Sequence, residues 1–312
     1  CIVYIHTNQF DYQCCVCYLQ VNFMKQLKLF IELTRLDKPI GYMLLFWPCA
    51  WGLTLAYDFN TGLKVYFFYL TLFFLGSVLM RSAGCIVNDI ADKNFDKKVF
   101  RTKNRPIASG KISISSAYFY TAILCLVAFL ILLHFNNFTI FLALGSMPLA
   151  FLYPFMKRFT YWPQLFLGIT FNYGILIGWA SINSEISLIS LIMYSGAIFW
   201  TLAYDTIYGF QDIKDDEIIG LKSTSIKFKK NPYYFLVLCY SIFSISLIFI
   251  GIIMNFNLFY FLFTIITFFH LFYLQLNKLN ILLPNSCLKI FKSNNSLGLI
   301  ILINLIIGKF LI

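Results

Sequence analysis

The chain has 312 residues, of which 60% are hydrophobic, 20% are aromatic and only 12% are charged. A water-soluble domain could not bury that much apolar surface in one core, so the composition excludes a soluble globular protein and indicates a membrane protein. The formal net charge is +11, and the positions of the basic residues decide what it means.

Nine apolar stretches are long enough, at about 20 residues each, to cross a bilayer as helices. Twenty-one of the 24 Lys and Arg residues fall in alternate connections between these stretches. The positive-inside rule places those connections in the cytoplasm, with the N-terminus inside and the C-terminus outside. The positive charge therefore reflects topology, and we expect no nucleic-acid partner. In chain order the expected spans are 40–57, 65–87, 114–134, 138–155, 161–181, 188–210, 233–253, 257–276 and 295–312.

The first 23 residues stand apart from the rest of the chain. They lack an initiating Met, and Met24 opens a more ordinary start. Our hypothesis is that residues 1–23 are an upstream translated artefact or the end of a fragment. The first 37 residues do not have the composition of a mitochondrial presequence, which favours a bacterial inner membrane over an organelle.

Seven of the 13 acidic residues occupy two short blocks. Both blocks lie on the predicted cytoplasmic side, and each follows the second span of a four-span set. We therefore expect residues 24–312 to form one transmembrane domain of two pseudo-repeats, about 37–158 and 159–277, plus a last helix over 295–312. The first acidic block contains Asp89, Asp92 and Asp96, and the second contains Asp205, Asp212, Asp215 and Asp216.

The first block has helical spacing. Asp89, Asp92 and Asp96 stand at i, i+3 and i+7, so their side chains project from one side of a helix. Asn88 stands four residues before Asp92 and shares that side. A simpler interpretation is that this stretch is a solvated, zwitterionic loop.

The second block has the same spacing. Asp205, Tyr208, Asp212 and Asp216 follow i, i+3, i+7 and i+11, which predicts a second acidic stripe on a helix. Two facing stripes of carboxylates repel each other unless cations lie between them, and hard oxygen ligands favour Mg2+, which also binds substrate phosphates. Because two blocks on one side both have helical register, the sequence favours a site for magnesium diphosphate over a solvated loop.

Basic residues follow both blocks, and one lies inside a span. An anionic ligand would need such donors, although positive-inside anchoring also explains each surface residue taken singly. Arg81 precedes Asn88 by about two helical turns and should face the bundle interior, where it either pairs with an aspartate or binds an anionic substrate. The surface residues concerned are Lys103, Arg105, Lys157, Arg158 and Lys222.

Four stretches in the same order resemble the UbiA-type intramembrane prenyltransferases, and among them the 4-hydroxybenzoate polyprenyltransferases of ubiquinone biosynthesis. The resemblance runs from about Leu33 to Phe228. It implies an all-α bundle of nine transmembrane helices around a central cavity with a lateral opening to lipid. The stretches are RLDKPIGYMLLFWPCAWGL, RSAGCIVNDIADKNFDKKVFRTKNRPIASGKIS, YPFMKRFTYWPQLFLG and AYDTIYGFQDIKDDEIIGLKSTSIKF.

The resemblance also implies roles for these residues. Mg2+ would be the cofactor, and polyprenyl diphosphate and 4-hydroxybenzoate would be the substrates, in contact with membrane lipid. Arg35 or Arg81 would bind the carboxylate of the aromatic acceptor, and depth in the membrane favours Arg81. The basic residues above would bind the diphosphate. The implied metal ligands are Asn88, Asp92, Asp96, Asp212 and Asp216, and the implied catalytic residues are Asp89, Asp92, Asp205, Tyr208 and Asp212.

Some points stay open. Lys214 stands where some relatives have a further Asp, so either Asp215 or Asp216 could approach the metal. Tyr153, Tyr173 and Tyr204 are candidates to line a dry cavity and stabilise a cation. One alternative is another member of the superfamily, with a menaquinone, haem O, tocopherol or ether-lipid product. A second alternative is a cation transporter, which would need carboxylates near the middle of the bilayer.

Overall fold

The structure is a computed structural model that describes residues 24–99 and 101–310. The predicted extension over 1–23 lies outside these residues. The described chain is helical and contains no strand. A helical segment over 24–34 comes first. It is followed by α2 (Pro39–Ala56), α3 (Lys64–Asp96), α4 (Ile114–Leu132), α5 (Asn137–Leu152), α6 (Met156–Phe159), α7 (Pro163–Asn183), α8 (Leu188–Gly209), α9 (Ile213–Ile219), α10 (Thr224–Lys227), α11 (Pro232–Ile253), α12 (Leu258–Phe268), the π-helix η3 (Phe269–Asn277) and α13 (Pro284–Phe310).

The all-α fold class is confirmed. Within the described residues, nine helices are long and apolar enough to span a membrane, as expected. Two boundaries differ from the expected spans. α3 continues to Asp96, so the first acidic block lies on the helix itself. α13 begins at Pro284 instead of 295, because Pro suits the first turn of a helix. The polar residues that follow Pro284 lower the hydropathy, so the hydropathy pattern did not show this part of the helix.

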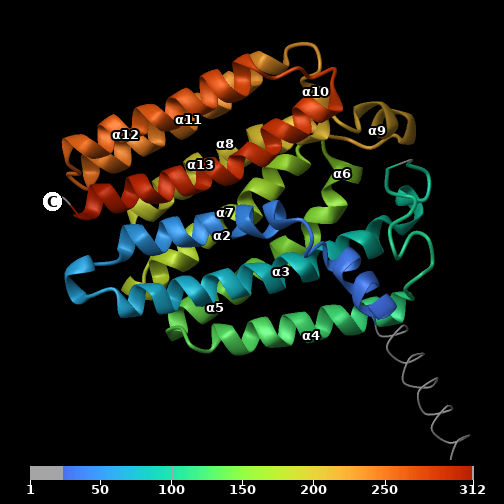
Figure 1. Cartoon of the computed structure of the whole chain (residues 1–312), viewed down its shortest axis with the longest axis horizontal. Coiled ribbons are helices and arrows are strands. Elements are labelled where there is room, and N and C mark those ends of the chain that lie inside the picture. Colours follow the sequence, from blue (N-terminus) through green and yellow to red (C-terminus); the bar gives the residue numbers. More distant parts are fainter. Residues whose placement is uncertain (1–23, 100, 311–312) are drawn as a thin grey trace, which may run out of the picture.

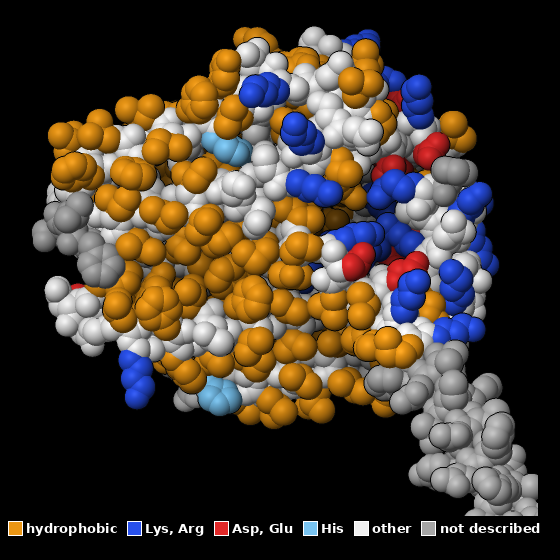
Figure 2. Space-filling view, in the orientation of Figure 1, with side chains coloured by type: hydrophobic (Ala, Val, Ile, Leu, Met, Phe, Trp, Pro, Cys, Tyr) orange, Lys and Arg blue, Asp and Glu red, His pale blue; other side chains and the backbone are white. Residues whose placement is uncertain are grey.

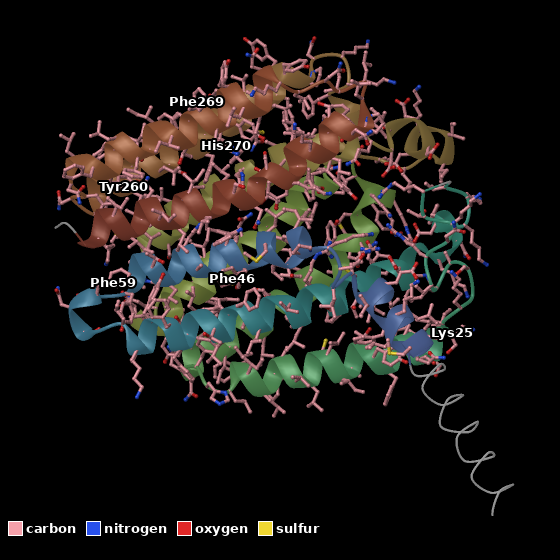
Figure 3. The ribbon with its side chains drawn as sticks, viewed as in Figure 1. Lys25, Phe46, Phe59, Tyr260, Phe269 and His270 are labelled. Atoms are coloured by element: carbon pink, nitrogen blue, oxygen red, sulfur yellow. The ribbon has the colours of Figure 1, made fainter. Side chains whose placement is uncertain are left out.

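The long helices run side by side, and the short helices α6, α9 and α10 gather at one end of the bundle (Figure 1). Hydrophobic side chains cover most of the visible face, whereas Lys, Arg, Asp and Glu concentrate toward that end (Figure 2). Lys25 lies near this polar end and Phe59 near the opposite end (Figure 3). A bilayer would therefore surround the apolar band, with both acidic blocks at one interface.

Close packing of α2 against α7 forms the centre of the bundle. Gly174 and Gly178 on α7 leave no room for a Cβ, because Cys49 and the backbone of α2 lie directly against them. Small residues at such a spacing let two membrane helices approach closely. Trp51 of α2 is fully buried and donates its indole N–H to the Gly298 carbonyl at 3.0 Å, which ties α13 to this pair. The division into two pseudo-repeats stays a prediction, although α2 and α7 begin the two proposed halves.

Caps and turns fix the short helices at the polar end. Gly220 ends α9 in the left-handed region, at φ 81°, a conformation that glycine adopts without strain. The hydroxyl of Ser223 then accepts the backbone N–H of Ile226 at 3.2 Å and caps α10. These turns return the chain toward α8, where the Ser225 hydroxyl donates to the Thr206 carbonyl at 2.8 Å, so that the segment after α8 lies over the polar end of the bundle.

Candidate active site

Residues of both acidic blocks, although not Asp215, line one polar cavity of about 210 Å³. This cavity, named here the polar pocket, lies at the end of the bundle where α6, α9 and α10 gather. Asp89 lies just outside it, in the wall of a larger cavity. Two segments that are far apart in the sequence therefore face the same cavity. The polar pocket is lined by Asn88, Asp92 and Asp96 of α3, Asp205 and Tyr208 of α8, Asp212 and Asp216, together with Arg101, Arg105, Lys157 and Lys222.

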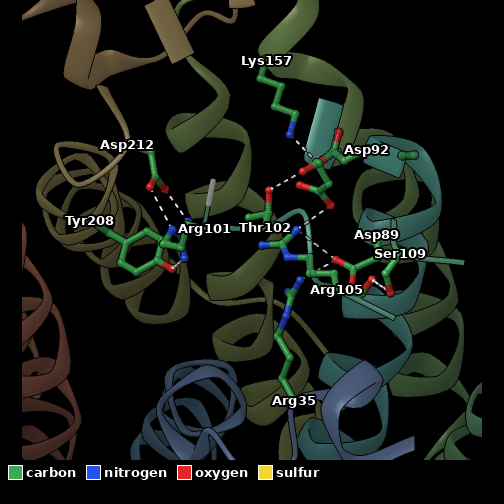
Figure 4. A network of polar contacts seen from close by, with 12 residues as sticks. Arg35, Asp89, Asp92, Arg101, Thr102, Arg105, Ser109, Lys157, Tyr208 and Asp212 are labelled. Atoms are coloured by element: carbon green, nitrogen blue, oxygen red, sulfur yellow. Dashed lines mark hydrogen bonds and ion pairs between the residues drawn. The ribbon is translucent and has the colours of Figure 1, made fainter. Parts of the chain in front are cut away.

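Two arginines hold Asp89 and Asp96, and Figure 4 shows both of them, Arg35 and Arg105, at Asp89. Asp89 accepts hydrogen bonds from Arg35 and, at 3.1 Å, from Arg105. The same Arg105 donates to Asp96 at 2.8 Å. Both carboxylates are buried, at 2% and 7% exposure, and buried carboxylates are stable only when they are paired and hydrogen-bonded. Arg105 therefore links two turns of α3 to the loop that follows it.

Asp92 is held by two basic residues of the short helix α6. Lys157 donates to its Oδ2, and Arg158 lies 3.7 Å from its Oδ1. Arg158 donates instead to the Ala91 carbonyl at 2.6 Å. The Oδ1 atom of Asp92 is buried and has no hydrogen-bond partner in the described part of the chain. An orphaned carboxylate oxygen at the edge of a polar cavity is available to a ligand.

The second block differs from its predicted form. The expected single stripe is wrong, because α8 ends at Gly209 and α9 begins only at Ile213. Glycine is a poor helix former, and Ser225 packs directly against Gly209 where a Cβ would lie. Asp212 therefore sits at the N-cap of α9 instead of on α8. The break still leaves the carboxylates of Asp205, Asp212 and Asp216 in the wall of the polar pocket.

Arg101 joins the second block to the loop after α3, and the sequence did not single it out. Its Nε donates to Asp212 at 2.8 Å, its Nη2 donates to the other oxygen of Asp212, and its Nη1 donates to the Tyr208 hydroxyl at 3.3 Å (Figure 4). Burial alone would lower the pKa of Arg101, but Tyr208 and Asp212 outweigh it and raise the pKa. Residues 101–112 form turns and bends without helical periodicity, so only the density of basic residues marked this loop.

The donor atoms suit a hard cation, although they do not yet surround one point. Among the described residues, no three His, Cys, Asp or Glu side chains converge as metal ligands, because Asp92 and Asp212 turn toward basic partners. Burial and the charge of Asp212 raise the pKa of Asp216 to about 6. Clustered carboxylates with an orphaned oxygen at Asp92 fit Mg2+, which prefers carboxylates and keeps other positions for water or phosphate. The predicted ligand set stays a prediction.

A second cavity of about 800 Å³ adjoins the polar pocket. The residues that line both are Asn88, Arg101, Thr102, Arg105, Tyr153, Pro154, Asp205 and Tyr208. Apolar side chains of α2, α3, α4, α5 and α7 form most of the larger cavity. It is named here the apolar cavity. The site thus consists of the polar pocket and the much larger apolar cavity beside it.

Arg81 lies in the wall of the apolar cavity. Within the described chain it forms no ion pair with an aspartate, which was one of the two predicted possibilities. Its Nη1 donates to the Cys85 Sγ at 2.9 Å, and its buried Nε has no partner. The guanidinium carbon lies 5.8 Å from the centre of the Phe171 ring. Arg35, by contrast, is already paired with Asp89.

The remaining predicted residues divide between the cavity walls and their surroundings. Lys222 lines the polar pocket and donates to the Phe159 carbonyl at 3.3 Å. Lys103 and Arg158 do not line either cavity. Three tyrosines proposed to line a dry cavity do lie in the wall of the apolar cavity: Tyr153, Tyr173 and Tyr204.

Comparisons with known proteins agree with this architecture. The profile of the UbiA prenyltransferase family matches residues 45–296. The chain is 39% identical to the mitochondrial 4-hydroxybenzoate polyprenyltransferase of Rattus norvegicus, over 91% of this chain and 76% of that protein. It is 41% identical to the 4-hydroxybenzoate octaprenyltransferase of Francisella tularensis subsp. novicida, over 91% of this chain and 98% of that protein.

Two solved structures have a similar fold. A UbiA homolog from Aeropyrum pernix K1 superposes with a TM-score of 0.70 at 23% identity, over 86% of this chain and 98% of that one. A UbiA homolog from Archaeoglobus fulgidus, solved bound to GPP and Mg2+, gives a TM-score of 0.65 at 17% identity, over 89% and 99% of the two chains.

Proposed function

The chain belongs to the UbiA prenyltransferase family, and we propose that it transfers a polyprenyl group from polyprenyl diphosphate to 4-hydroxybenzoate. The new bond forms at the ring carbon ortho to the hydroxyl, and diphosphate is released. The reaction belongs to ubiquinone biosynthesis. One observation carries the proposal: a pocket lined by two acidic blocks opens directly into a large apolar cavity, as an amphiphilic diphosphate requires.

The polar pocket would hold the diphosphate and its metal ions. We propose that Mg2+, when bound, neutralises the leaving diphosphate and so eases breakage of its bond to carbon. Arg101, Arg105 and Lys157 exchange their carboxylate partners for diphosphate oxygens and stabilise the charge that grows there. The residues that would hold Mg2+ are Asn88, Asp92, Asp96, Asp212 and Asp216.

The aromatic acceptor would lie between the polar pocket and the deeper cavity. Arg81 binds its carboxylate, because its Nε has no partner whereas Arg35 is committed to Asp89. Asp205 lies in both walls and, in the described chain, forms no ion pair, so its carboxylate can accept the proton that the ring loses. The Tyr208 ring beside it stabilises the allylic cation that forms when diphosphate leaves.

The apolar cavity would also have to exclude water from the reacting groups. An allylic cation reacts with water, so transfer to a ring carbon needs a dry site. Tyr204 lines this cavity and is only 1% exposed, which supports a site with little access to water at that point. The surrounding α2, α4 and α7 walls are mostly apolar.

The position of the acidic blocks disfavours the transporter alternative. A carrier would need carboxylates near the middle of the spans, whereas these lie at the ends of α3 and α8 and on α9. We propose that this end faces the cytoplasm of a bacterium and that the protein resides in its inner membrane. The basic residues at that end support the orientation.

A direct assay tests the proposal. Purified protein should convert 4-hydroxybenzoate and a polyprenyl diphosphate to the ortho-prenylated acid when Mg2+ is present. Competition between 4-hydroxybenzoate and the aromatic acceptors of menaquinone or tocopherol synthesis should leave the 4-hydroxybenzoate product dominant. Preferred use of another acceptor, or no product with any acceptor, would refute the assignment.

A further inference from the structure

The last helix, α13, meets the site at a single side chain. It lies outside the two proposed repeats, and the sequence pattern placed no site residue on it. Among the described residues of α13, Phe291 alone lines the apolar cavity, and none lines the polar pocket. The contribution of α13 to the site therefore depends on this ring.

Phe291 packs against two tyrosines of α8 that border both cavities. Its ring centre lies 4.5 Å from that of Tyr208 and 5.8 Å from that of Tyr204. Both tyrosines line the apolar cavity, and Tyr208 lines the polar pocket as well. Residues four apart share a helical face, so Phe291 covers one aromatic stripe of α8. The three rings lie together beside the place where the two cavities meet.

A buried asparagine fixes Phe291 in this position. Asn294 lies one turn further along α13 and is 0% exposed. Its Oδ1 accepts hydrogen bonds from the indole N–H of Trp200 at 2.8 Å and from the side-chain amide of Gln275 at 3.0 Å. A buried polar group that loses its partner is costly, so these bonds fix the register of α13 against α8. This register holds Phe291 opposite the two tyrosines.

The outer face of α13 around Phe291 is hydrophilic. Lys289 and Lys292 flank Phe291 in the sequence and are exposed, whereas Phe291 itself is half-buried. Lysine side chains near the end of a membrane helix extend to the hydrated interface. Phe291 thus lies between a hydrated surface and the tyrosine rings that face the reacting groups.

The contact between Phe291 and Tyr208 becomes more important when a donor binds. The Tyr208 hydroxyl accepts a hydrogen bond from Arg101. In the proposed function Arg101 turns to the diphosphate, so this hydroxyl loses its donor. The contact with Phe291 involves no group that the diphosphate needs. It can therefore hold the Tyr208 ring in place throughout the reaction.

We propose that Phe291 is a specificity-determining residue that keeps water away from the allylic cation. This inference rests on the proposed function and concerns the nucleophile that the cation meets. With Phe291 in place, the ring carbon of the acceptor attacks the cation. Without it, the oxygen of a water molecule bonds to the cationic carbon and loses a proton to solvent, which gives a prenyl alcohol beside the released diphosphate.

The test measures the ratio of prenyl alcohol to prenylated 4-hydroxybenzoate formed from geranyl diphosphate with Mg2+. Phe291→Ala should raise this ratio about tenfold, since loss of several carbons from an apolar contact changes discrimination by this order. Phe291→Leu retains more bulk and should raise it by a smaller factor. Phe272→Ala is the matched control and should leave the ratio unchanged. Phe272 is also half-buried beside a tyrosine ring, that of Tyr240, but lines neither cavity.

The ratio of the two products does not depend on how much of the protein is folded. A merely structural role of Phe291 would therefore leave it unchanged. Phe291→Leu provides a second variant should Phe291→Ala elute as aggregate from size exclusion. A ratio equal to that of the unaltered protein in every variant of Phe291 that folds would overturn the inference.

A measurement without acceptor separates this inference from the proposed function. Phe291→Ala should hydrolyse geranyl diphosphate faster than the unaltered protein and Phe272→Ala do. In water enriched in the heavy oxygen isotope, the label should enter the alcohol. If the unaltered protein forms no prenylated 4-hydroxybenzoate, the proposed function fails, yet this faster hydrolysis still supports the role of Phe291. Label found only in diphosphate, or equal hydrolysis rates in the three proteins, would contradict that role.

Discussion

The two acidic blocks face one pocket, but the protein holds them differently. Asp89, Asp92 and Asp96 lie on one uninterrupted helix and are at most 7% exposed. Asp212 lies beyond a helix break, its side chain is 18% exposed, and its partner Arg101 is 45% exposed. Buried charges need fixed partners, whereas exposed pairs contribute little to stability. We call the first acidic block the first wall of the polar pocket and the second block the second wall. The comparison indicates that the fold fixes the carboxylates of the first wall, whereas those of the second wall can move when a ligand binds.

Removal of divalent metal should have the largest effect, because it affects both walls together. EDTA should reduce prenyl transfer to background, and excess Mg2+ should restore it. Product formation from 4-hydroxybenzoate measures the effect, and EDTA already saturated with Mg2+ is the control. Transfer that continues in EDTA would show that the carboxylates serve a purpose other than binding metal.

Substitution of one carboxylate in each block should distinguish the walls. Asp92→Asn should lower kcat/KM about 10³-fold or more, and Asp212→Asn about 10²-fold, because the adjustable wall can recruit another oxygen. Glu185→Gln, in the exposed loop before α8, is the control. Equal losses in the two variants would mean that both walls are equally fixed, and full activity in either would remove its carboxylate from the site.

The two linking arginines should differ in their effect on stability. Arg105→Gln leaves buried Asp89 and Asp96 short of a partner and should lower the free energy of unfolding by about 2 kcal/mol or more. Arg101→Gln breaks a more exposed pair and should lower it by about 1 kcal/mol or less. Unfolding of the metal-free protein in detergent measures both. A larger loss in the free energy of unfolding for Arg101→Gln than for Arg105→Gln would mean that the second block is the more rigid of the two.

Arg81 belongs to neither acidic block, and its substitution should have the smallest effect on activity. Arg81→Gln should raise KM for 4-hydroxybenzoate about tenfold and change KM for the prenyl diphosphate little, because the side chain would bind the acceptor carboxylate. Initial rates over a grid of both substrate concentrations separate the two constants. A larger change in the donor constant would assign Arg81 to the diphosphate.

The first wall could be predicted from sequence because helical spacing alone places its residues. Asn88, Asp89, Asp92 and Asp96 needed only an unbroken helix, and α3 provides one. The same reasoning failed for Asp212, since Gly209 and its contact with Ser225 end α8 first. Gly209 itself was a local signal for a helix end, whereas its contact with Ser225 joins two separate segments and no local pattern contains it.

Tertiary packing also decided the features that sequence missed. Arg101 reaches Asp212 from a loop without periodicity, so its spacing carried no signal. Gly76 and Gly178 look alike as single glycines in apolar helices. Only their surroundings show that one borders a cavity and the other a packed helix. The nine spans, in contrast, follow from hydropathy and were expected within a few residues, apart from the start of α13 and the end of α3.

The length of α3 determines where the two products go. Its 33 residues extend about 50 Å, which exceeds the roughly 30 Å of hydrocarbon in a bilayer. Charged side chains are costly in hydrocarbon, so we expect the end that carries the first acidic block to extend into the headgroup layer while the apolar rest stays immersed. Inorganic diphosphate can diffuse straight into the aqueous phase, and the prenylated acid can pass sideways into the lipid leaflet. Neither product has to traverse the membrane.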